Sequence, residues 1–492
     1  MNINKKLVYG LIILVLVILA AVLLLLFRKP VPKPEESLNF IIVVSDDQRA
    51  DTLWTMKNLQ KEFLSRGVKF DNGFATTSIC CPSRASILTG LYGHNTGVLR
   101  NNPPHGGFSK FDDSQSLSLW LQEAGYNTAL MGKYLNGYGE SPLYIPPGWS
   151  KWIAFTEVGY DEFILNMDGK IKEFQENDGV YSTDFLFENG INFIKENEEQ
   201  PFFLYLVPYA PHAPATPKNE DKKKFADFLN RPVSYNENTL SDKPSFYHDV
   251  PLLEDKVQER LDKLARNQLR SLQPLDRGMK MLFDELNRLN LLEKTVVIYI
   301  GDNGYQWGEH RLIAKGLPYE ESIKVPFWIY VPGINPRTDK TNLVLNIDLA
   351  PTILELANIP KPQNWKFDGK SIVSILKNPK ISLRDDFFIE MLTRDKDKKN
   401  DQRPRRSFWG VRTKDYKLVE YSTGDREFYD LIKDPFEMEN IYNSSVYWQI
   451  NPLLEPKLNY VREQMSKYIS SIESEPELEI ENEGDEAGEG IY

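Results

Sequence analysis

The two cysteines of the chain stand side by side, in a stretch whose residue types suit nucleophilic chemistry on an anion. Neighbouring cysteines cannot form an ordinary disulfide without strain, and Pro82 suits the first turn of a helix. We therefore expect Cys80 just before a helix N-terminus, where free N–H groups and the helix dipole favour an anion. Two structural cysteines in a helix cap are the alternative. The full stretch reads Cys80-Cys81-Pro82-Ser83-Arg84-Ala85-Ser86-Ile87-Leu88-Thr89-Gly90.

Acidic side chains follow two predicted strands, which suggests a cation site. Residues 39–45 and 295–300 are continuously apolar and β-branched, as in strands buried on both faces of a sheet. In open α/β sheets, ligands bind beyond the carboxyl ends of the strands. Carboxylate and amide oxygens suit Ca²⁺ or Mg²⁺, although each acidic pair taken alone is more typical of a turn. The side chains in question are Asp46, Asp47, Asp302 and Asn303.

The stretch from Cys80 matches the pattern Cys-x-Pro-Ser-Arg-x-x-x-Leu-Thr-Gly, and by this motif the chain resembles the sulfatase family along most of residues 38–440. In that family the first cysteine is oxidised to formylglycine. The resemblance therefore implies that Cys80 is the modified nucleophile and that a formylglycine-generating enzyme is a partner. It also implies a calcium site, with magnesium less favoured, whose ligands are Asp46, Asp47, Asp302, Asn303 and the modified Cys80.

Three further basic residues match sulfatase elements in the family's order. Lys133 lies in a Gly-Lys pair, His212 in Ala-Pro-His-Ala-Pro, and Lys315 precedes Pro-Tyr-Glu. The resemblance implies that Arg84, Lys133 and Lys315 neutralise the sulfate oxygens, and that His212 or Lys315 protonates the departing alcohol oxygen. Each of these side chains taken alone would be assigned to a solvated or capping position.

One departure from the family concerns the position two residues after Lys133, where many arylsulfatases have histidine and this chain has Leu135. The form Gly-Lys-Tyr-Leu-Asn at residues 132–136, with residues 147–152, resembles glycan 6-O-sulfatases of the N-acetylglucosamine type. This implies a sulfated glycan, or else a small sulfate ester, as substrate. His310 is the candidate for a substitute base or substrate contact.

Two other functions remain open at this point. A phosphate or phosphonate ester hydrolase of the same superfamily would share the fold, the metal-binding acids and sometimes the cysteine motif. A membrane-displayed glycan-binding module would have lost catalysis, but every metal and nucleophile position is retained. Sulfate-ester hydrolysis is therefore the favoured prediction.

The arrangement of apolar runs predicts an α/β fold, with a large mixed, mostly parallel sheet sandwiched by helices. Further strand-like runs lie at residues 202–207 and 326–331, and helical periodicity at 257–264, 275–289 and 347–359. After residue 384, short strand-like pieces predict a smaller antiparallel sheet with a closing helix near 454–470. We accordingly expect a catalytic domain at 38–383, a C-terminal α+β subdomain at 384–472 and an acidic disordered tail at 473–492.

The N-terminal region predicts a membrane anchor. Between a short tail at residues 1–6 and a Pro-rich linker at 28–37, residues 7–27 form an apolar run long enough to cross a bilayer as a helix. Basic residues on both sides leave its orientation open, but exposed sulfate esters are mostly extracellular. We therefore expect a single-pass membrane protein with an extracytoplasmic catalytic domain. The formal net charge of −11 predicts no nucleic-acid partner and requires a local basic pocket for a polyanionic substrate.

Overall fold

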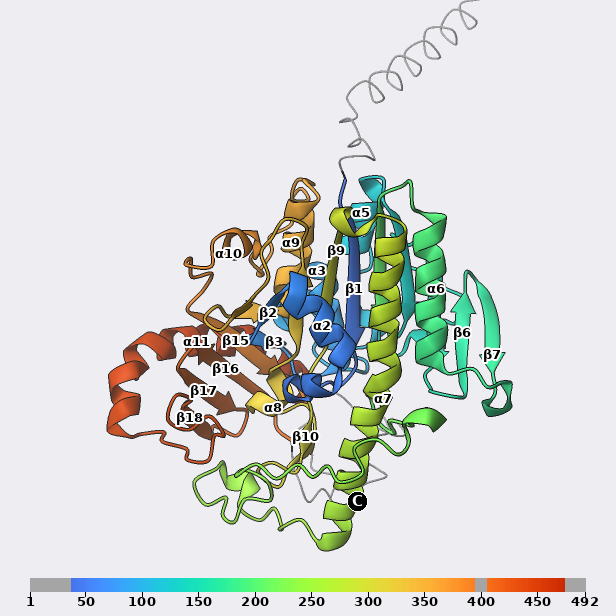
Figure 1. Cartoon of the computed structure of the whole chain (residues 1–492). Coiled ribbons are helices and arrows are strands. Elements are labelled where there is room, and N and C mark those ends of the chain that lie inside the picture. The colour runs from blue at the N-terminus through green and yellow to red at the C-terminus, as the bar shows by residue number, and fades with distance from the viewer. Residues whose placement is uncertain (1–36, 394–404, 474–492) are drawn as a thin grey trace, which may run out of the picture. The chain divides into compact units, whose positions relative to one another are not determined.

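The centre of the protein is a ten-stranded mixed sheet with the strand order β13-β2-β12-β9-β1-β8-β4-β5-β6-β7 (Figure 1). The computed structural model describes residues 37–393 and 405–473. The strands of the large sheet are β1 Asn39–Ser45, β2 Val68–Phe70, β4 Asn127–Gly132, β5 Lys151–Glu157, β6 Phe163–Met167, β7 Lys170–Phe174, β8 Phe202–Val207, β9 Thr295–Gly301, β12 Phe327–Tyr330 and β13 Arg337–Asp339. Two small ladders pair β3 Gly73–Phe74 with β14 Val344–Leu345, and β10 Gln306–Trp307 with β11 Ile313–Ala314.

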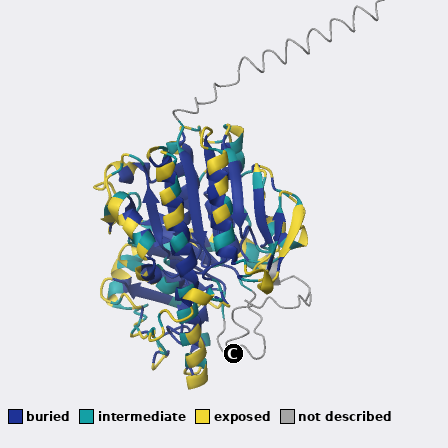
Figure 2. Ribbon diagram, turned by 45° about the vertical axis from the view of Figure 1, so that its right-hand side comes forward, coloured by how far each residue is buried: buried dark blue, intermediate teal, exposed yellow. Residues whose placement is uncertain are grey.

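Helices cover both faces of this sheet, and the alternation of side chains along β1 shows why. Phe40, Ile42 and Val44 belong to one buried apolar cluster, whereas Ile41 and Val43 belong to another on the opposite face. The first cluster includes α3 Cys80–Thr89, α5 Leu117–Glu123, α9 Leu349–Leu356 and α10 Val373–Lys377; the second includes α2 Lys57–Arg66, α6 Ser182–Glu196 and α7 Asp255–Arg288. The helices turn buried sides inward and exposed sides to solvent (Figure 2). Short helices α4 Gly93–Thr96 and α8 Glu320–Ile323 complete this part.

The predicted α/β architecture is confirmed, and the continuously apolar runs are the strands whose positions were predicted best. The run at 39–45 is β1, the run at 202–207 is β8, and the run at 295–300 is β9, which continues to Gly301. The two helical patterns at 257–264 and 275–289 form one helix, α7, which contains Pro274. The antiparallel strands β6 and β7 at one edge were not predicted.

A second, four-stranded antiparallel sheet follows, as the sequence predicted. Its strands are β15 Asp386–Met391, β16 Phe408–Thr413, β17 Tyr416–Tyr421 and β18 Arg426–Asp430. Helix α11 Ser445–Glu473 packs on it through Leu454, Leu458 and Val461, and it starts earlier than the predicted closing helix. From Leu38 onward the chain clusters as one compact unit, so the boundary at 383/384 stays a prediction.

The predicted membrane segment at residues 7–27 lies outside the described residues, as do the tail at 1–6, nearly all of the linker at 28–37 and nearly all of the acidic tail at 473–492. Within residues 37–393 and 405–473, no helix combines the length and the apolar character needed to cross a bilayer.

Candidate active site

Four neighbouring parallel strands end at one edge of the large sheet and bring the predicted site residues together. In the order β9, β1, β8, β4, each strand pairs in parallel with the next. Ser45 and Gly301, the last residues of β1 and β9, are register partners. The side chains that follow these strands therefore meet beyond the sheet. They are Asp46 and Asp47 after β1, Lys133 after β4, His212 after β8, and Asp302 and Asn303 after β9.

The glycine before Lys133 has a structural cause. Gly132 has a φ of +119°, and a Cβ at this position would lie 2.1 Å from the carbonyl oxygen of Val207. A side chain would therefore push β4 away from β8. The backbone N–H of Lys133 donates to the same carbonyl at 2.8 Å, which fixes the position from which the Lys133 side chain reaches Asp46.

Cys80 is the first residue of helix α3, so the helix begins one residue earlier than predicted, and Pro82 lies in its first turn. Its thiol is fully buried, with Sγ 3.4 Å from Asp46 Oδ1 and 2.8 Å from Lys315 Nζ. Burial, reinforced by the charge of Asp46, raises the pKa of the Cys80 thiol well above its usual range. An unmodified Cys80 would therefore remain a neutral thiol, which is a poor nucleophile.

Three buried carboxylates of the site are each paired with a buried cation. Lys133 Nζ lies 2.6 Å from Asp46 Oδ2, Lys315 Nζ lies 2.6 Å from Asp47 Oδ1, and Arg84 Nε lies 2.9 Å from Asp302 Oδ2. Burial acts to raise the pKa of Asp46, but the nearby cations, Lys133 first among them, outweigh it, so this pKa is lowered. The pKa of Asp302 rises to about 6 because burial and the charge of Asp46 outweigh Arg84.

The oxygen atoms of the site fit a bound divalent cation. One ligand atom from each of four side chains lies within 4.8 Å of the others; these are Asp46, Asp47, Cys80 and His212. Asp47 Oδ2 and Asn303 Oδ1 are buried and have no hydrogen-bond partner among the described residues, a costly state that a cation would relieve. Carboxylate and amide oxygens are ligands that Ca²⁺ prefers. Both Asp302 oxygens are already accepting hydrogen bonds, from Arg84 and from the backbone N–H groups of Asp47 and Asn303.

The imidazole of His212 is held in one orientation beside this cluster. Its Nδ1 lies 2.8 Å from the carbonyl oxygen of Ala213, so Nδ1 carries the proton, and Nε2 faces Asp47 Oδ2 at 3.5 Å. The ring stacks on Tyr209 with 4.7 Å between centroids. Burial and then the charge of Lys315 lower the pKa of His212 to about 3, so the ring is neutral in this arrangement.

Comparison with known families agrees with this geometry. The family model described as Sulfatase matches residues 38–359. The chain belongs to the sulfatase family. A second model, described as N-sulphoglucosamine sulphohydrolase, C-terminal, matches residues 308–464. These matches confirm the family that the cysteine motif predicted, the sulfatases, whose enzyme class is the sulfuric ester hydrolases.

Individual sulfatases show how far the similarity reaches. The chain is 36% identical over 350 residues to an extracellular sulfatase Sulf-1 homolog of Caenorhabditis elegans; the match covers 69% of this chain but only about half, 49%, of that relative. It is 33% identical over 372 residues to the N-acetylglucosamine-6-sulfatase of Homo sapiens, covering 72% of this chain and 67% of the relative. A structure solved with its substrate D-glucosamine-2-N,6-O-disulfate shares the fold, with a TM-score of 0.74, 22% identity, and coverage of 89% and 100%.

The sulfatase site lies at the floor of a cavity of about 680 Å³. Lys133, His212 and Lys315 line it, so the cationic groups next to Cys80 face the space where a substrate would enter. Leu135 lies in the wall, where many arylsulfatases have histidine. The rest of the lining is mainly polar and includes Arg100 and Arg405.

His310 is the one predicted site residue that the structure does not bring to the cluster around Cys80. Its Nδ1 lies 2.7 Å from Glu237 Oε2, its ring stacks on Tyr319 at 4.4 Å, and its side chain is fully buried. Burial and the charge of Lys243 lower its pKa to about 3. In this structure His310 packs between loops instead of facing the cavity.

Sequence reasoning missed several residues that shape the site. Arg100 and Arg405 come from segments far apart in the chain and carry no motif, so only their charge could have drawn attention to them. Ser83 is more readily explained in retrospect, because it belongs to the cysteine motif. Its hydroxyl donates to the carbonyl of Asp302 at 2.5 Å and ties α3 to the end of β9.

Proposed function

We propose that the chain hydrolyses sulfate monoesters of a glycan, of the N-acetylglucosamine-6-sulfate type, with a formylglycine made from Cys80 as nucleophile. The calcium ligands in this proposal are Asp46, Asp47, Asp302, Asn303 and the modified Cys80. The observation that carries the proposal is the position of Cys80, at the N-terminus of α3 and in contact with both Asp46 and Lys315. Family membership supports the same reading.

Oxidation of Cys80 to formylglycine supplies the nucleophile that the thiol itself does not provide. When oxidised to formylglycine and hydrated, residue 80 supplies a hydroxyl that attacks sulfur, and the second hydroxyl allows sulfate to leave as the aldehyde re-forms. A buried thiol with a raised pKa does neither. The calcium ion, when bound, supplies positive charge to the sulfate oxygens. The modifying enzyme is therefore part of the proposal as a required partner.

The chain's own cations act on the sulfate group and on the leaving oxygen. Lys133 and Lys315 face the cavity, and Arg84 lies behind them. Burial acts to lower the pKa of Lys133, but Asp46 outweighs it and raises this pKa, so the ammonium stays charged. Fixed cations in a water-poor site stabilise the charge that develops in the transition state. Lys315 would donate the proton to the departing alcohol, or His212 would do so after its free Nε2 has taken up a proton.

A glycan substrate is supported by two observations. The Gly-Lys-Tyr-Leu-Asn form at residues 132–136 resembles N-acetylglucosamine 6-sulfatases, and a relative of that name is 33% identical. The cavity of about 680 Å³ lies within the size range of small-ligand sites, and its polar lining suits a hydroxylated ring.

The experiment that tests this proposal compares sulfate, phosphate and phosphonate esters of one chromogenic alcohol, and then 6-O-sulfated with 2-O-sulfated hexosamines. We expect preferential turnover of the sulfate ester and of the 6-O-sulfated sugar. Peptide mass spectrometry across residues 80–84 should show a loss of about 18 Da on Cys80. Faster turnover of the phosphate or phosphonate ester, with an unmodified thiol, would replace the proposal with the phospho-hydrolase alternative.

We also propose that residues 7–27 anchor the enzyme as a single-pass membrane protein with its catalytic part outside the cytoplasm. The apolar run supports the anchor, and similarity to relatives named extracellular sulfatases supports the extracytoplasmic position. Protease protection in intact cells tests it: an externally added protease should degrade the catalytic part, and full protection would contradict the proposal.

A further inference from the structure

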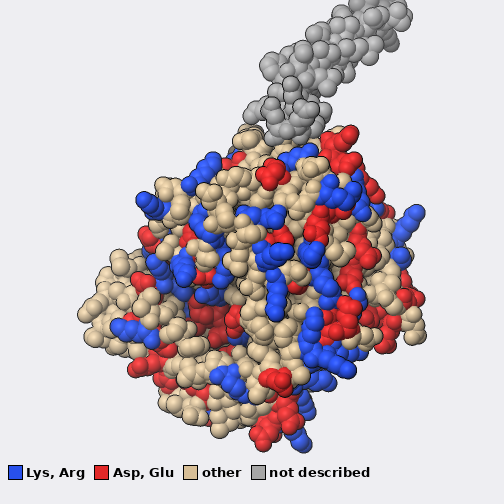
Figure 3. Space-filling model, viewed as in Figure 1, with Lys and Arg blue, Asp and Glu red and all other residues tan. Residues whose placement is uncertain are grey.

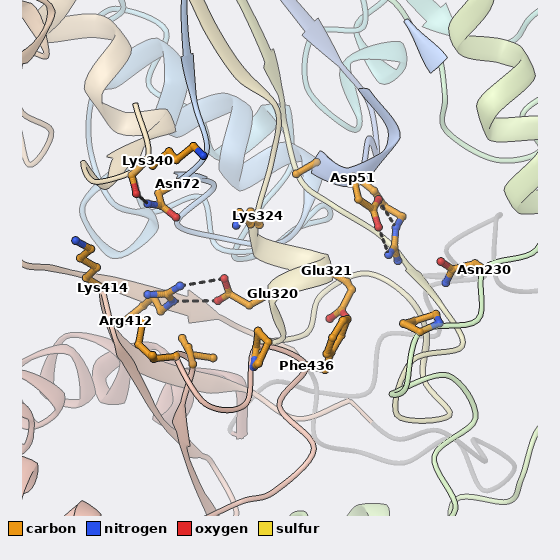
Figure 4. Close-up of a pocket in the computed structure, with 16 residues that line it drawn as sticks. Asp51, Asn72, Asn230, Glu320, Glu321, Lys324, Lys340, Arg412, Lys414 and Phe436 are labelled. Atoms are coloured by element: carbon orange, nitrogen blue, oxygen red, sulfur yellow. Dashed lines mark hydrogen bonds and ion pairs between the residues drawn. The ribbon is translucent and has the colours of Figure 1, made fainter. Parts of the chain in front are cut away.

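A second cavity, of about 410 Å³, lies between the large sheet and the small C-terminal sheet (Figure 4). Asn72, Lys324 and Lys340 come from the first part of the structure, and Arg412 and Lys414 from β16 and the turn after it. Its lining shares no residue with the lining of the catalytic cavity. Basic and acidic side chains are interspersed over the face shown in Figure 3, so recognition of charge on that face has to come from local clusters.

One wall of the second cavity carries three lysines without ion-pair partners among the described residues. These lysines are Lys324, Lys340 and Lys414; Figure 4 shows Lys340 and Lys414 at the left of the cavity and Lys324 near its centre. The neighbouring Arg412 differs, because its guanidinium is held by both oxygens of Glu320 at 3.0 and 3.1 Å. In a chain with a net charge of −11, three unpaired ammonium groups around one hollow form a local anion-attracting wall.

The remaining lining suits a hydroxylated ring more than a bare ion. Glu321 Oε2 is buried without a hydrogen-bond partner among the described residues, so it can accept or share a hydrogen bond with a ligand hydroxyl. The pKa of Glu321 is raised to about 8 by burial and by Glu309, which allows its carboxyl group to donate as well. Ile432 and Phe436, 68% and 43% exposed, add apolar surface at the rim.

Residues that line the two cavities lie within the span of an extended oligosaccharide. Lys315 lines the catalytic cavity and Glu320, five residues later, lines the second, so their Cα atoms are at most about 18 Å apart. Strand β16 also connects the two cavities. Arg405, just before this strand, lines the catalytic cavity, and Arg412, near the end of the strand, lines the second cavity.

We propose that the second cavity binds an anionic sugar residue, carrying a sulfate ester or a carboxylate, of the same polymer whose ester is cleaved at Cys80. The identity of the polymer rests on the proposed function, but the cationic wall does not. Because one polymer molecule would then bind at both cavities, the enzyme would have a higher affinity for polymers than for small esters.

The test uses the full chain with Lys324, Lys340 and Lys414 changed to alanine together. The matched control changes three exposed lysines elsewhere that have no ion pairs among the described residues, Lys170, Lys222 and Lys223. The substrates are heparin, as a sulfated and carboxylated polymer, and a small chromogenic sulfate ester. We expect the KM for heparin to rise on the order of tenfold in the triple variant, since each exposed ion pair contributes little alone, with kcat and the KM for the small ester unchanged.

An equal rise in the control variant, an equal rise for the small ester, or an unchanged KM for heparin would each overturn the proposal. Retention on immobilised heparin, read as the salt concentration at elution, is independent of turnover. If no sulfate ester is hydrolysed, the proposed function fails, but earlier elution of the triple variant alone would still support this site. Carboxyl-reduced and desulfated heparins identify the anion that the second cavity binds. The heparin form on which wild type still elutes at a higher salt concentration than the triple variant retains that anion.

Discussion

The ammonium group of Lys315 lies 2.8 Å from the thiol of Cys80 and 2.6 Å from a carboxylate oxygen of Asp47. One cation thus contacts both the predicted nucleophile and a predicted metal ligand. Because Ala314, the last residue of β11, has a φ of 73°, this contact depends on a left-handed backbone conformation at the end of the strand that directs Lys315 into the site.

Replacing Lys315 by methionine should lower kcat/KM by roughly 10²–10³-fold, the usual cost of losing one group that stabilises transition-state charge. Steady-state kinetics on a small sulfate ester measures this. Thermal unfolding in Ca²⁺ should show that the variant is folded. Wild-type kcat/KM in a folded variant would rule out a catalytic role.

The two adjacent cysteines should behave differently. Cys80→Ala should abolish turnover, because no aldehyde can form, whereas Cys81→Ala should retain most activity at a stability cost of ~1 kcal/mol for one lost buried sulfur. Both side chains are fully buried, so each serves as the other's packing control. Loss of activity in Cys81→Ala but not in Cys80→Ala would instead assign the nucleophile to Cys81.

Removing calcium with a chelator should abolish activity and lower the unfolding temperature. At a metal concentration about 100-fold above Kd, binding adds ~2.7 kcal/mol to the free energy of unfolding. Asn303→Ala should reduce the shift that added Ca²⁺ produces, because Asn303 Oδ1 is one of the buried oxygens without a partner. An identical shift in wild type and variant would exclude Asn303 as a ligand.

Two adjacent glutamates should affect stability in opposite directions. Burial acts to raise the pKa of Glu320, but Arg412 and Lys417 outweigh it and lower this pKa to about 2. Its ionised form therefore stabilises the fold above the unfolded-state pKa, and that contribution is lost as the pH falls from about 4.5 towards 2. Glu320→Gln should cost on the order of 3 kcal/mol at pH 7, because it leaves Arg412 without its buried partner.

Glu321, with a pKa raised to about 8 by burial and by Glu309, should act in the opposite sense. The folded state binds the proton more tightly than the unfolded chain, so stability falls as the pH rises from about 4.5 to 8. Glu321→Gln should therefore stabilise the protein at pH 8 and have little effect at pH 4. Denaturant unfolding at several pH values checks both glutamates, and equal pH profiles for the two variants would contradict the assignments.

Deleting residues 1–36 should give an active enzyme in the soluble fraction, because the compact unit begins at Leu38. Activity per mole on a small ester should match that of the full chain in detergent. Failure of the shortened chain to fold would show that the N-terminal region contributes to more than anchoring.

The sequence predicted those parts of the fold and site that are encoded locally. Strand β1 was found because every residue from Phe40 to Val44 is apolar, and α3 because Pro82 marks its first turn. The position of the acidic pairs after two predicted strands suggested one cation site, and the cysteine motif was needed to assign them as calcium ligands. The position of His310, the lining by Arg100 and Arg405 and the second cavity depend on how distant loops pack, which no local pattern records.

The pairing of Asp46, Asp47 and Asp302 with Lys133, Lys315 and Arg84 sets three fixed negative charges against three positive ones. A bound divalent cation would leave this group with an excess charge of +2. That excess matches the released sulfate dianion better than the singly charged ester, so we expect inorganic sulfate to act as a competitive product inhibitor. Turnover at high product concentration would then be limited by sulfate release instead of by bond cleavage.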